Sequence, residues 1–243
     1  GRAIAFVLLP RESPCARLLL GSVLGSLLLQ WCPALCAFFC GFSPYAHGLG
    51  LLLAAGCAGS CVFINRKKGL HRFAGALGMP RAFLRHRFLW AVLLMWAFFV
   101  YLVLHSFRLA GGAVHSCQAT YGDMSMHLSF ITSLARQQVF PPEYSLLPGT
   151  RLSYPFLADS ISASLYLWGA PLRLRYALPM WAAGAQVFFG FWLFAQRMLR
   201  SGGRAAFAWV LFFCNGGLGL FYFLGGGPGS FSRIFTAFYE TPT

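Results

Sequence analysis

An aspartate and a histidine four residues apart are the pair in this sequence most suited to chemistry. Asp123 and His127 lie in YGDMSMHLSFITSLARQQVFPPEY, residues 121–144, in a chain that has only five acidic residues. Side chains at i and i+4 are neighbours on a helix, so the pair could share a proton, a metal ion or a substrate hydroxyl. Two simpler roles compete with this one: Asp123 could cap a helix, and His127 could be a packing histidine.

The residues around this pair predict an amphipathic helix over 124–137. At 100° per residue, its polar side is Ser125, Ser129, Thr132, Ser133 and Arg136, and its apolar side is Met124, Leu128, Phe130, Ile131 and Leu134. Asp123 and His127 fall on the apolar side, so we expect both to point toward whatever the helix packs on. The helix should end near Phe140, because Pro141-Pro142 cannot continue it.

A second amphipathic helix is predicted over 156–168, after a turn at Pro148-Gly149 and an extended segment. One stripe consists of Leu157, Ile161, Leu165 and Trp168, and the opposite side of Asp159, Ser162 and Tyr166. Asp159 should therefore face solvent or a pocket, and a plain surface carboxylate is the alternative. Arg136 and Arg151 could bind phosphate, which guanidinium groups do well, or could be solvated.

Long apolar stretches must position these helices. The chain is 58% hydrophobic and 10% charged, against about 25% charged residues in soluble domains. Five stretches approach the roughly 20 residues that a membrane span needs, and none carries Lys, Arg, Asp or Glu in its interior: 18–40, 48–64, 88–107, 176–195 and 205–224. We predict an all-α polytopic transmembrane protein with about five spans and an outer loop carrying two amphipathic interfacial helices.

The net charge of +14 is distributed unevenly along the chain. Segments 65–87 and 196–204 are rich in Lys and Arg and would share one face of the membrane. By the positive-inside rule these segments are cytoplasmic, 108–175 is extracytoplasmic, and the bacterial cytoplasmic membrane is the predicted location. The basic loops lack base-stacking aromatics and a nucleic-acid motif, so no nucleic-acid partner is expected.

Other signals are weaker. Cys32, Cys36 and Cys40 recur on one helix face, which suits a soft metal or, more simply, close helix packing. Residues 225–229 (GGGPG) are a linker, since no GK[ST] follows as in a P-loop. His105 and His115 flank the start of the outer loop without a spacing that requires a site. No cleavable signal peptide is evident at the N-terminus.

The ordered motifs resemble the GT-C superfamily of polytopic glycosyltransferases. The resemblance covers roughly residues 88–224, and its pattern is a span, GD-x-x-x-H, FPPE, PG-x-x-L-x-YPFL-x-D and GG-x-G. The residues that carry it are Gly122, Asp123, His127, Phe140, Pro141, Pro142, Glu143, Pro148, Gly149, Leu152, Tyr154, Pro155, Asp159, Gly216, Gly217, Leu218 and Gly219.

This resemblance implies transfer of a sugar from a polyprenyl-phosphate carrier to a glycan or protein acceptor outside the cell, beside membrane lipids. Asp123 would be the catalytic or metal-contacting carboxylate with His127 beside it, and Mg²⁺ or Mn²⁺ is the metal that such a pair could hold. The substrate-binding residues would be Arg136, Glu143, Arg151, Tyr154 and Asp159.

Two departures from the family pattern affect the expected domains. The family's best-known members have this loop after their first span, whereas here two further spans come earlier in the chain. The chain is also too short for the usual dozen spans, so we expect an N-terminal fragment of a longer protein. Its parts would be 1–87 with two spans and the basic loop, the glycosyltransferase-like core 88–224, and the Gly-rich segment 225–243.

A transporter and a non-catalytic membrane scaffold are the alternative functions. The spans lack the intramembrane charges that mark ion pathways, and inverted repeats are not evident. Both observations favour the enzyme over the transporter.

Overall fold

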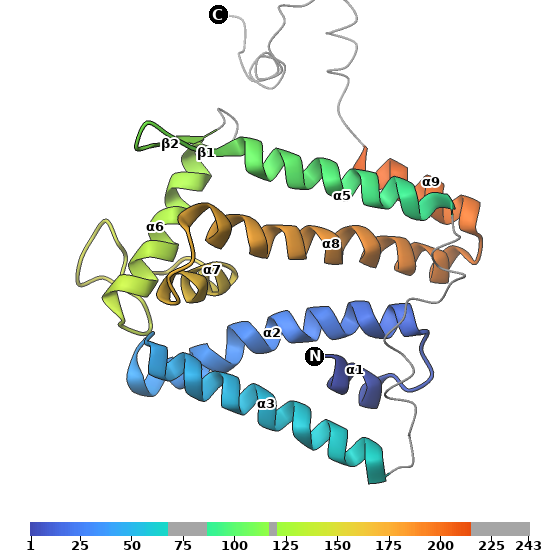
Figure 1. Cartoon of the computed structure of the whole chain (residues 1–243), viewed down its shortest axis with the longest axis horizontal. Helices are drawn as coiled ribbons and strands as arrows, with labels where there is room; N and C mark the ends of the chain where they lie inside the picture. The colour runs from blue at the N-terminus through green and yellow to red at the C-terminus, as the bar shows by residue number, and fades with distance from the viewer. Residues whose placement is uncertain (68–86, 117–120, 215–243) are drawn as a thin grey trace, which may run out of the picture.

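The computed structural model describes residues 1–67, 87–116 and 121–214. Its regular elements are almost all helices (Figure 1), and their order is α1 (Arg2–Leu8), α2 (Pro14–Cys40), α3 (Pro44–Lys67), α5 (Arg87–Ser106), β1 (Phe107–Ala110), β2 (Ala113–Ser116), α6 (Tyr121–Gln137), α7 (Leu157–Leu167), α8 (Leu172–Leu199) and α9 (Gly202–Phe213). The predicted all-α class is confirmed.

Four helices are long and apolar enough to cross a membrane: Pro14–Cys40, Pro44–Asn65, Arg87–Ser106 and Leu172–Leu199. They correspond to the first four predicted spans. Their outer faces expose large apolar side chains, such as Leu52, Trp90 and Leu94, each at least 68% exposed. Such surfaces are rare on soluble monomers, and they suit contact with lipid.

The predicted span boundaries need adjustment. The predicted third span includes Phe107, which instead begins β1. The predicted fourth span begins at Tyr176, whereas α8 begins at Leu172, so Arg173 and Arg175 belong to its first turns. Of the predicted fifth span, only α9, a helix of 12 residues, is described; its remainder, 215–224, lies outside the described residues.

Capping residues set the helix boundaries. Ser13 accepts a hydrogen bond from the Ala16 amide, and Pro14 takes the first helical position of α2, where a missing N–H costs nothing. Ser201 caps α9 in the same way through the Arg204 amide. Gln138, with φ of 54°, ends α6 before the two prolines that were predicted to stop it.

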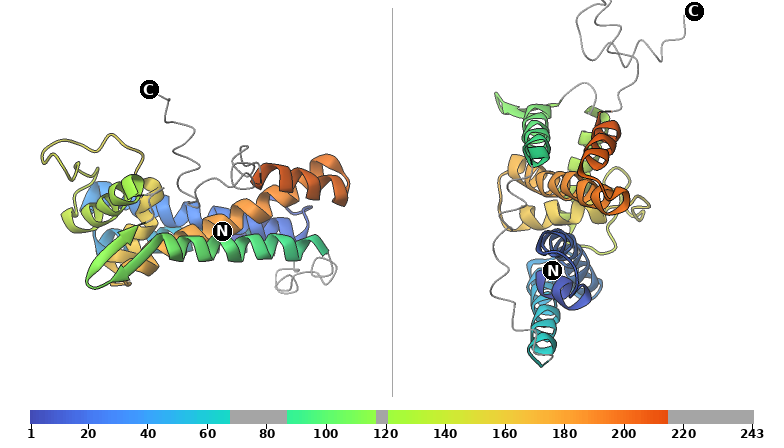
Figure 2. Two further views of the ribbon diagram at one scale, coloured as in Figure 1. Left: turned by 90° about the horizontal axis from the view of Figure 1, so that it is seen from above. Right: turned by 90° about the vertical axis from the view of Figure 1, so that its right-hand side faces the viewer.

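The long helices form two groups that face each other. In the first group α1 packs on α2 and α3, and in the second α8 packs between α5 and α9. Figure 2 shows the two groups on opposite sides of the molecule, with α2 facing α8. We call these the N-terminal group and the C-terminal group.

The short helices α6 and α7 lie at one end of both groups, together with the hairpin (Figure 1). The opposite end holds the start of α2, the end of α8 and the start of α9, where Arg11, Arg197, Arg200 and Arg204 lie. There Arg197 pairs with Glu12 and so links the two groups. Successive long helices therefore alternate in direction, as the sequence predicts.

An aromatic core holds the C-terminal group together. Trp192 is fully buried, and Trp209 donates from its indole nitrogen to the Phe188 carbonyl oxygen at 2.9 Å. Phe88 of α5 packs against both tryptophans. A second core joins α6 and α7 to the N-terminal group through Ala37, Phe42, Ile131, Leu134 and Ala163.

A two-stranded hairpin follows α5 and was not predicted. β1 and β2 pair antiparallel, with Arg108 opposite His115. The turn residues Gly111 and Gly112 have φ of 57° and 76°, and positive φ at both central residues is the geometry that favours hairpin strands. The Gly-Gly pair between apolar residues was the available signal.

Candidate functional site

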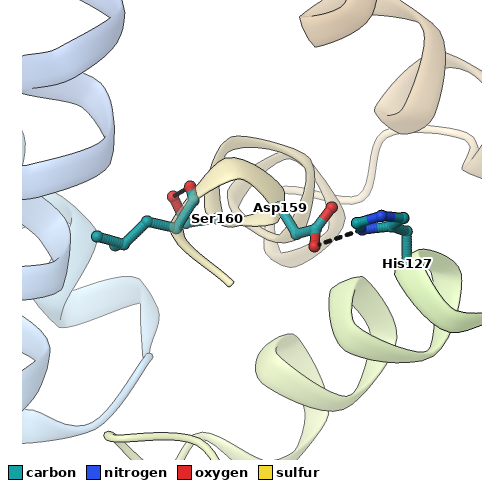
Figure 3. Close-up of polar contacts among 4 residues, drawn as sticks. His127, Asp159 and Ser160 are labelled. Atoms are coloured by element: carbon teal, nitrogen blue, oxygen red, sulfur yellow. Dashed lines mark hydrogen bonds and ion pairs between the residues drawn. The ribbon is translucent and has the colours of Figure 1, made fainter. Parts of the chain in front are cut away.

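His127 and Asp159 form a hydrogen-bonded pair between α6 and α7. The Nδ1 atom of His127 lies 2.9 Å from the Oδ2 atom of Asp159, and Figure 3 shows the two side chains directed at each other from facing helices. The Asp159 residue is 8% exposed. The two residues are 32 positions apart in sequence, so only the folding of the segment between α5 and α8 brings them together.

Burial and pairing act on the carboxyl group in opposite directions. Burial raises the pKa of Asp159 above its usual range, because it disfavours the charged form, while the hydrogen bond and the positive character of His127 lower the pKa in part. When Asp159 is ionised it can only accept, so Nδ1 of His127 carries the hydrogen. Nε2 is then the atom able to take up a proton.

The pair lies on a cleft, which we call the polar cleft. It has a volume of about 540 Å³ and is lined by α2, α6, α7 and α8, including Ser26, Gln30, His127, Asp159, Ser162, Tyr176 and Gln186. This volume lies within the usual range of small-molecule sites, roughly 300–1,000 Å³. His127 keeps 32% of its side chain exposed, so a ligand can reach it.

A second cavity adjoins the polar cleft between α2 and α8, and we call it the apolar groove. Its volume is about 290 Å³, and its lining is almost entirely apolar: Cys15, Leu18, Leu19, Ser22, Ala182, Ala185, Gln186, Phe189 and Leu193. Ala182 and Gln186 line both cavities. Because the two cavities share these residues, they adjoin along the facing sides of two membrane-spanning helices, and the titratable pair lies in the polar one.

Asp123 does not point inward as predicted. Its residue is exposed, in the first turn of α6, and the i, i+4 pairing with His127 is replaced by the pair with Asp159. The prediction is wrong because α6 turns His127, Phe130 and Leu134 toward α7.

Tyr154 is the predicted substrate-binding residue that accompanies the pair most closely. Its ring centroid lies 6.0 Å from that of His127 and 5.3 Å from that of Phe130. Because Tyr154 is 43% exposed, a ligand beside the imidazole can contact its ring. The structure therefore brings together His127, Tyr154 and Asp159 of the predicted site.

The other predicted substrate-binding residues lie elsewhere. Glu143 and Arg151 face each other as a backbone bridge, and Glu143 accepts a hydrogen bond from the Gly149 amide at 3.2 Å, which holds the predicted turn. Arg136 is at the far end of α6, where it donates to the Tyr166 hydroxyl. None of the three lines the polar cleft.

The polar side of α7 is buried rather than solvated. Asp159, Ser160, Ser162 and Ala163 are its buried residues. The reason is that α7 packs on α6, α2 and α8 at once, and its small side chains allow close approach. The alternative of a surface carboxylate at Asp159 is therefore wrong, whereas its pocket-facing placement is confirmed.

Sequence reasoning missed the polar residues that the spans contribute. Gln186 of α8 donates to the Ser26 hydroxyl of α2 at 3.0 Å, where the polar cleft and the apolar groove meet. Gln30 and Tyr176 also line the polar cleft. Burying a glutamine in an apolar span costs free energy unless its amide is hydrogen-bonded. The presence of Gln30 and Gln186 within apolar stretches was therefore the available signal.

Within the described residues, no group of three or more His, Cys, Asp or Glu side chains could hold a metal ion. Asp123 and His127 therefore belong to no such group there. Cys32, Cys36 and Cys40 form no such group in that part of the chain either.

The fold and the cavities define an all-α polytopic membrane protein in which a half-buried histidine pairs with a buried aspartate at one end of the helices. No protein-family model, no curated protein and no solved structure matches the chain. Function must therefore be inferred from the site itself.

Proposed function

We propose that this chain is an integral membrane glycosyltransferase, or the donor-binding part of one, that moves a sugar from a polyprenyl-phosphate carrier to an extracytoplasmic acceptor. The observation that supports it most is the pair of adjoining cavities, one polar around His127 and Asp159 and the other apolar between α2 and α8. An amphiphile with a polar head and a long apolar tail matches this division.

In the proposed reaction, His127 rather than Asp123 is the base. Nε2 of His127 takes the proton of an acceptor hydroxyl while the hydroxyl oxygen attacks the anomeric carbon. The bond from that carbon to the phosphate oxygen breaks, and polyprenyl phosphate leaves. Asp159 accepts from Nδ1 and stabilises the imidazolium that forms. General-base catalysis of this kind contributes about 10²–10⁴-fold in rate.

The test uses the full chain in lipid nanodiscs with a radiolabelled polyprenyl-phosphate sugar and a hydroxyl acceptor. His127→Gln should lower the transfer rate by about 10²–10⁴-fold and leave donor binding within a few-fold. Asp123→Asn is the matched control, with near-normal transfer expected. Loss of transfer in the control alone would restore Asp123 as the base. Donor binding without any transfer by the wild type would favour a transporter or scaffold.

The proposed orientation places α6 and α7 outside the cytoplasm. It is supported by the basic residues at the opposite end of the helices. In a cysteine-free background, Ser153→Cys should react with a membrane-impermeant maleimide in intact cells, and Arg204→Cys only after lysis. The reverse pattern would exclude an extracytoplasmic acceptor.

A further inference from the structure

Two arginines from different helices meet on one tyrosine at the far end of α6. Arg136 donates from Nε to the Tyr166 hydroxyl oxygen at 2.9 Å. From the start of α8, the Arg175 guanidinium lies over the same ring, with its Cζ atom 3.7 Å from the ring centroid. Tyr166 of α7 thus holds one cation at its hydroxyl and the other on its face.

The hydrogen bonds that position these two guanidinium groups use only some of their N–H donors. Arg175 is fixed through Nε, which donates to the Ala170 carbonyl oxygen. Each guanidinium has five N–H donors. In the part of the chain that the structure describes, the hydrogen bonds of Arg136 and Arg175 leave the terminal nitrogens without a protein acceptor. Those nitrogens form the fork that binds phosphate in a bidentate way.

No carboxylate neutralises the two charges among the described residues. Glu12 pairs with Arg197 and Asp159 with His127, and Glu143 binds the Gly149 amide. The Cζ atoms of Arg136 and Arg175 lie 5.8 and 3.7 Å from the Tyr166 ring centroid, so two like charges are held near one ring and repel each other. An anion between them would remove this repulsion.

The level of Tyr166 relative to the membrane surface indicates which kind of anion would bind there. Arg175 lies in the first turn of a membrane-spanning helix, and Trp168, 61% exposed, lies seven residues earlier in the sequence, at the C-terminal end of α7. Tryptophan is enriched where a membrane meets water. The two guanidinium groups are therefore at the level of lipid headgroups.

We propose that Arg136, Tyr166 and Arg175 form a binding site for the phosphate group of an anionic membrane lipid. The site is distinct from the polar cleft, which none of the three residues lines. It is one turn or two further along α7 than Asp159, about 10 Å at 1.5 Å per residue. A lipid held there would fasten the start of α8 to α6 and α7, and this role does not depend on sugar transfer.

The test is native mass spectrometry of the full chain, titrated with dioleoylphosphatidylglycerol and, separately, with zwitterionic dioleoylphosphatidylcholine. The wild type should retain the anionic lipid preferentially. Arg136→Gln and Arg175→Gln should each weaken that binding roughly tenfold, as expected for the loss of a charge-assisted contact. Tyr166→Phe, which keeps the ring and removes the oxygen, should weaken it less.

Arg151→Gln is the matched control, because Arg151 is an exposed arginine at the same end of the molecule. It should bind the lipid like the wild type. Equal weakening in this control, or equal retention of the two lipids by the wild type, would overturn the site. If a glutamine variant loses its helical circular dichroism, Arg136→Lys and Arg175→Lys replace it, and unchanged binding in both would overturn the bidentate contact.

Inorganic phosphate separates the two sources of the anion. With a lipid site, phosphate at millimolar concentration should leave the bound phosphatidylglycerol in place. Complete displacement by phosphate, with the same dependence on Arg136 and Arg175, would show a site for a free anion and would overturn the assignment to lipid.

Discussion

At the scale of single residues, the central feature is which aspartate pairs with His127. The sequence pointed to a carboxylate–imidazole pair, and the structure contains one, but the partner of His127 is Asp159 and not Asp123. Helical spacing could place Asp123 and His127 on one face. It could not show that α7 would bring a second carboxylate closer.

The pKa of Asp159 gives a direct test of this pair. Because burial raises that pKa, the protonated carboxyl band in infrared spectra should persist to higher pH than for an exposed aspartate, whose pKa is about 3.9. The contribution of this carboxyl to stability is fully present below its unfolded-state pKa and is lost as pH rises through the higher folded-state pKa.

Variants assign the infrared signal. Asp159→Asn should abolish the persistent band and Asp123→Asn should leave it unchanged. His127→Gln should shift the band to still higher pH, since His127 lowers the pKa of Asp159. An unchanged band in His127→Gln would mean that the two side chains do not interact in the membrane.

At the scale of elements, predictability followed the length and the apolar character of each segment. The four spans and the two amphipathic helices were predicted because periodicity and composition extend over many residues. The burial of the serine face of α7 was not predicted, because its polar residues form the pattern of a solvated side. That face is buried because α7 packs against three neighbouring helices. The hairpin rests on two glycines, too short a signal beside a long span.

The contact between α2 and α3 is so close at one glycine that a single added methyl group should disturb it. A Cβ atom on Gly50 would lie 2.5 Å from the backbone nitrogen of Pro33, and backbone cannot move aside. Gly50→Ala should therefore separate the helices and lower the free energy of unfolding by about 1–3 kcal/mol, the usual cost of overpacking. Unfolding of the protein by SDS in mixed micelles measures this.

Gly56 of the same helix is the control for that substitution. A Cβ atom there meets nothing within 4 Å, so Gly56→Ala should be neutral or should stabilise the helix by up to about 1 kcal/mol. Equal losses in the two variants would mean that helix flexibility, and not the approach of α3 to Pro33, is what alanine disturbs.

At the scale of the whole molecule, two helix groups face each other, and the two cavities lie where α2 faces α8. α6 and α7 bridge the groups beside the polar cleft, and the Glu12–Arg197 pair bridges them at the opposite end. Between these bridges, the Ser26–Gln186 hydrogen bond crosses from α2 to α8. Composition predicted the spans, but the spacing between the groups depends on which helices pack together and is not encoded in any one segment.

The junction of the two cavities tests whether they bind one ligand. Ala182 lines both the polar cleft and the apolar groove, so Ala182→Trp should place a bulky side chain at the border between them. Binding of a long polyprenyl phosphate should weaken about tenfold, which corresponds to about 1.4 kcal/mol. A water-soluble short-chain analogue, which needs only the polar cleft, should bind as to the wild type. Fluorescence polarisation with labelled lipids measures both affinities.

Val187→Trp is the matched control for the junction. Val187 is 53% exposed on the same helix and lines neither cavity, so the same bulky side chain there should leave both affinities unchanged. If Ala182→Trp weakened the short analogue as much as the long lipid, the apolar groove would not hold the tail. The polar cleft would then act alone, and the division between a polar head site and an apolar tail site would have to be abandoned.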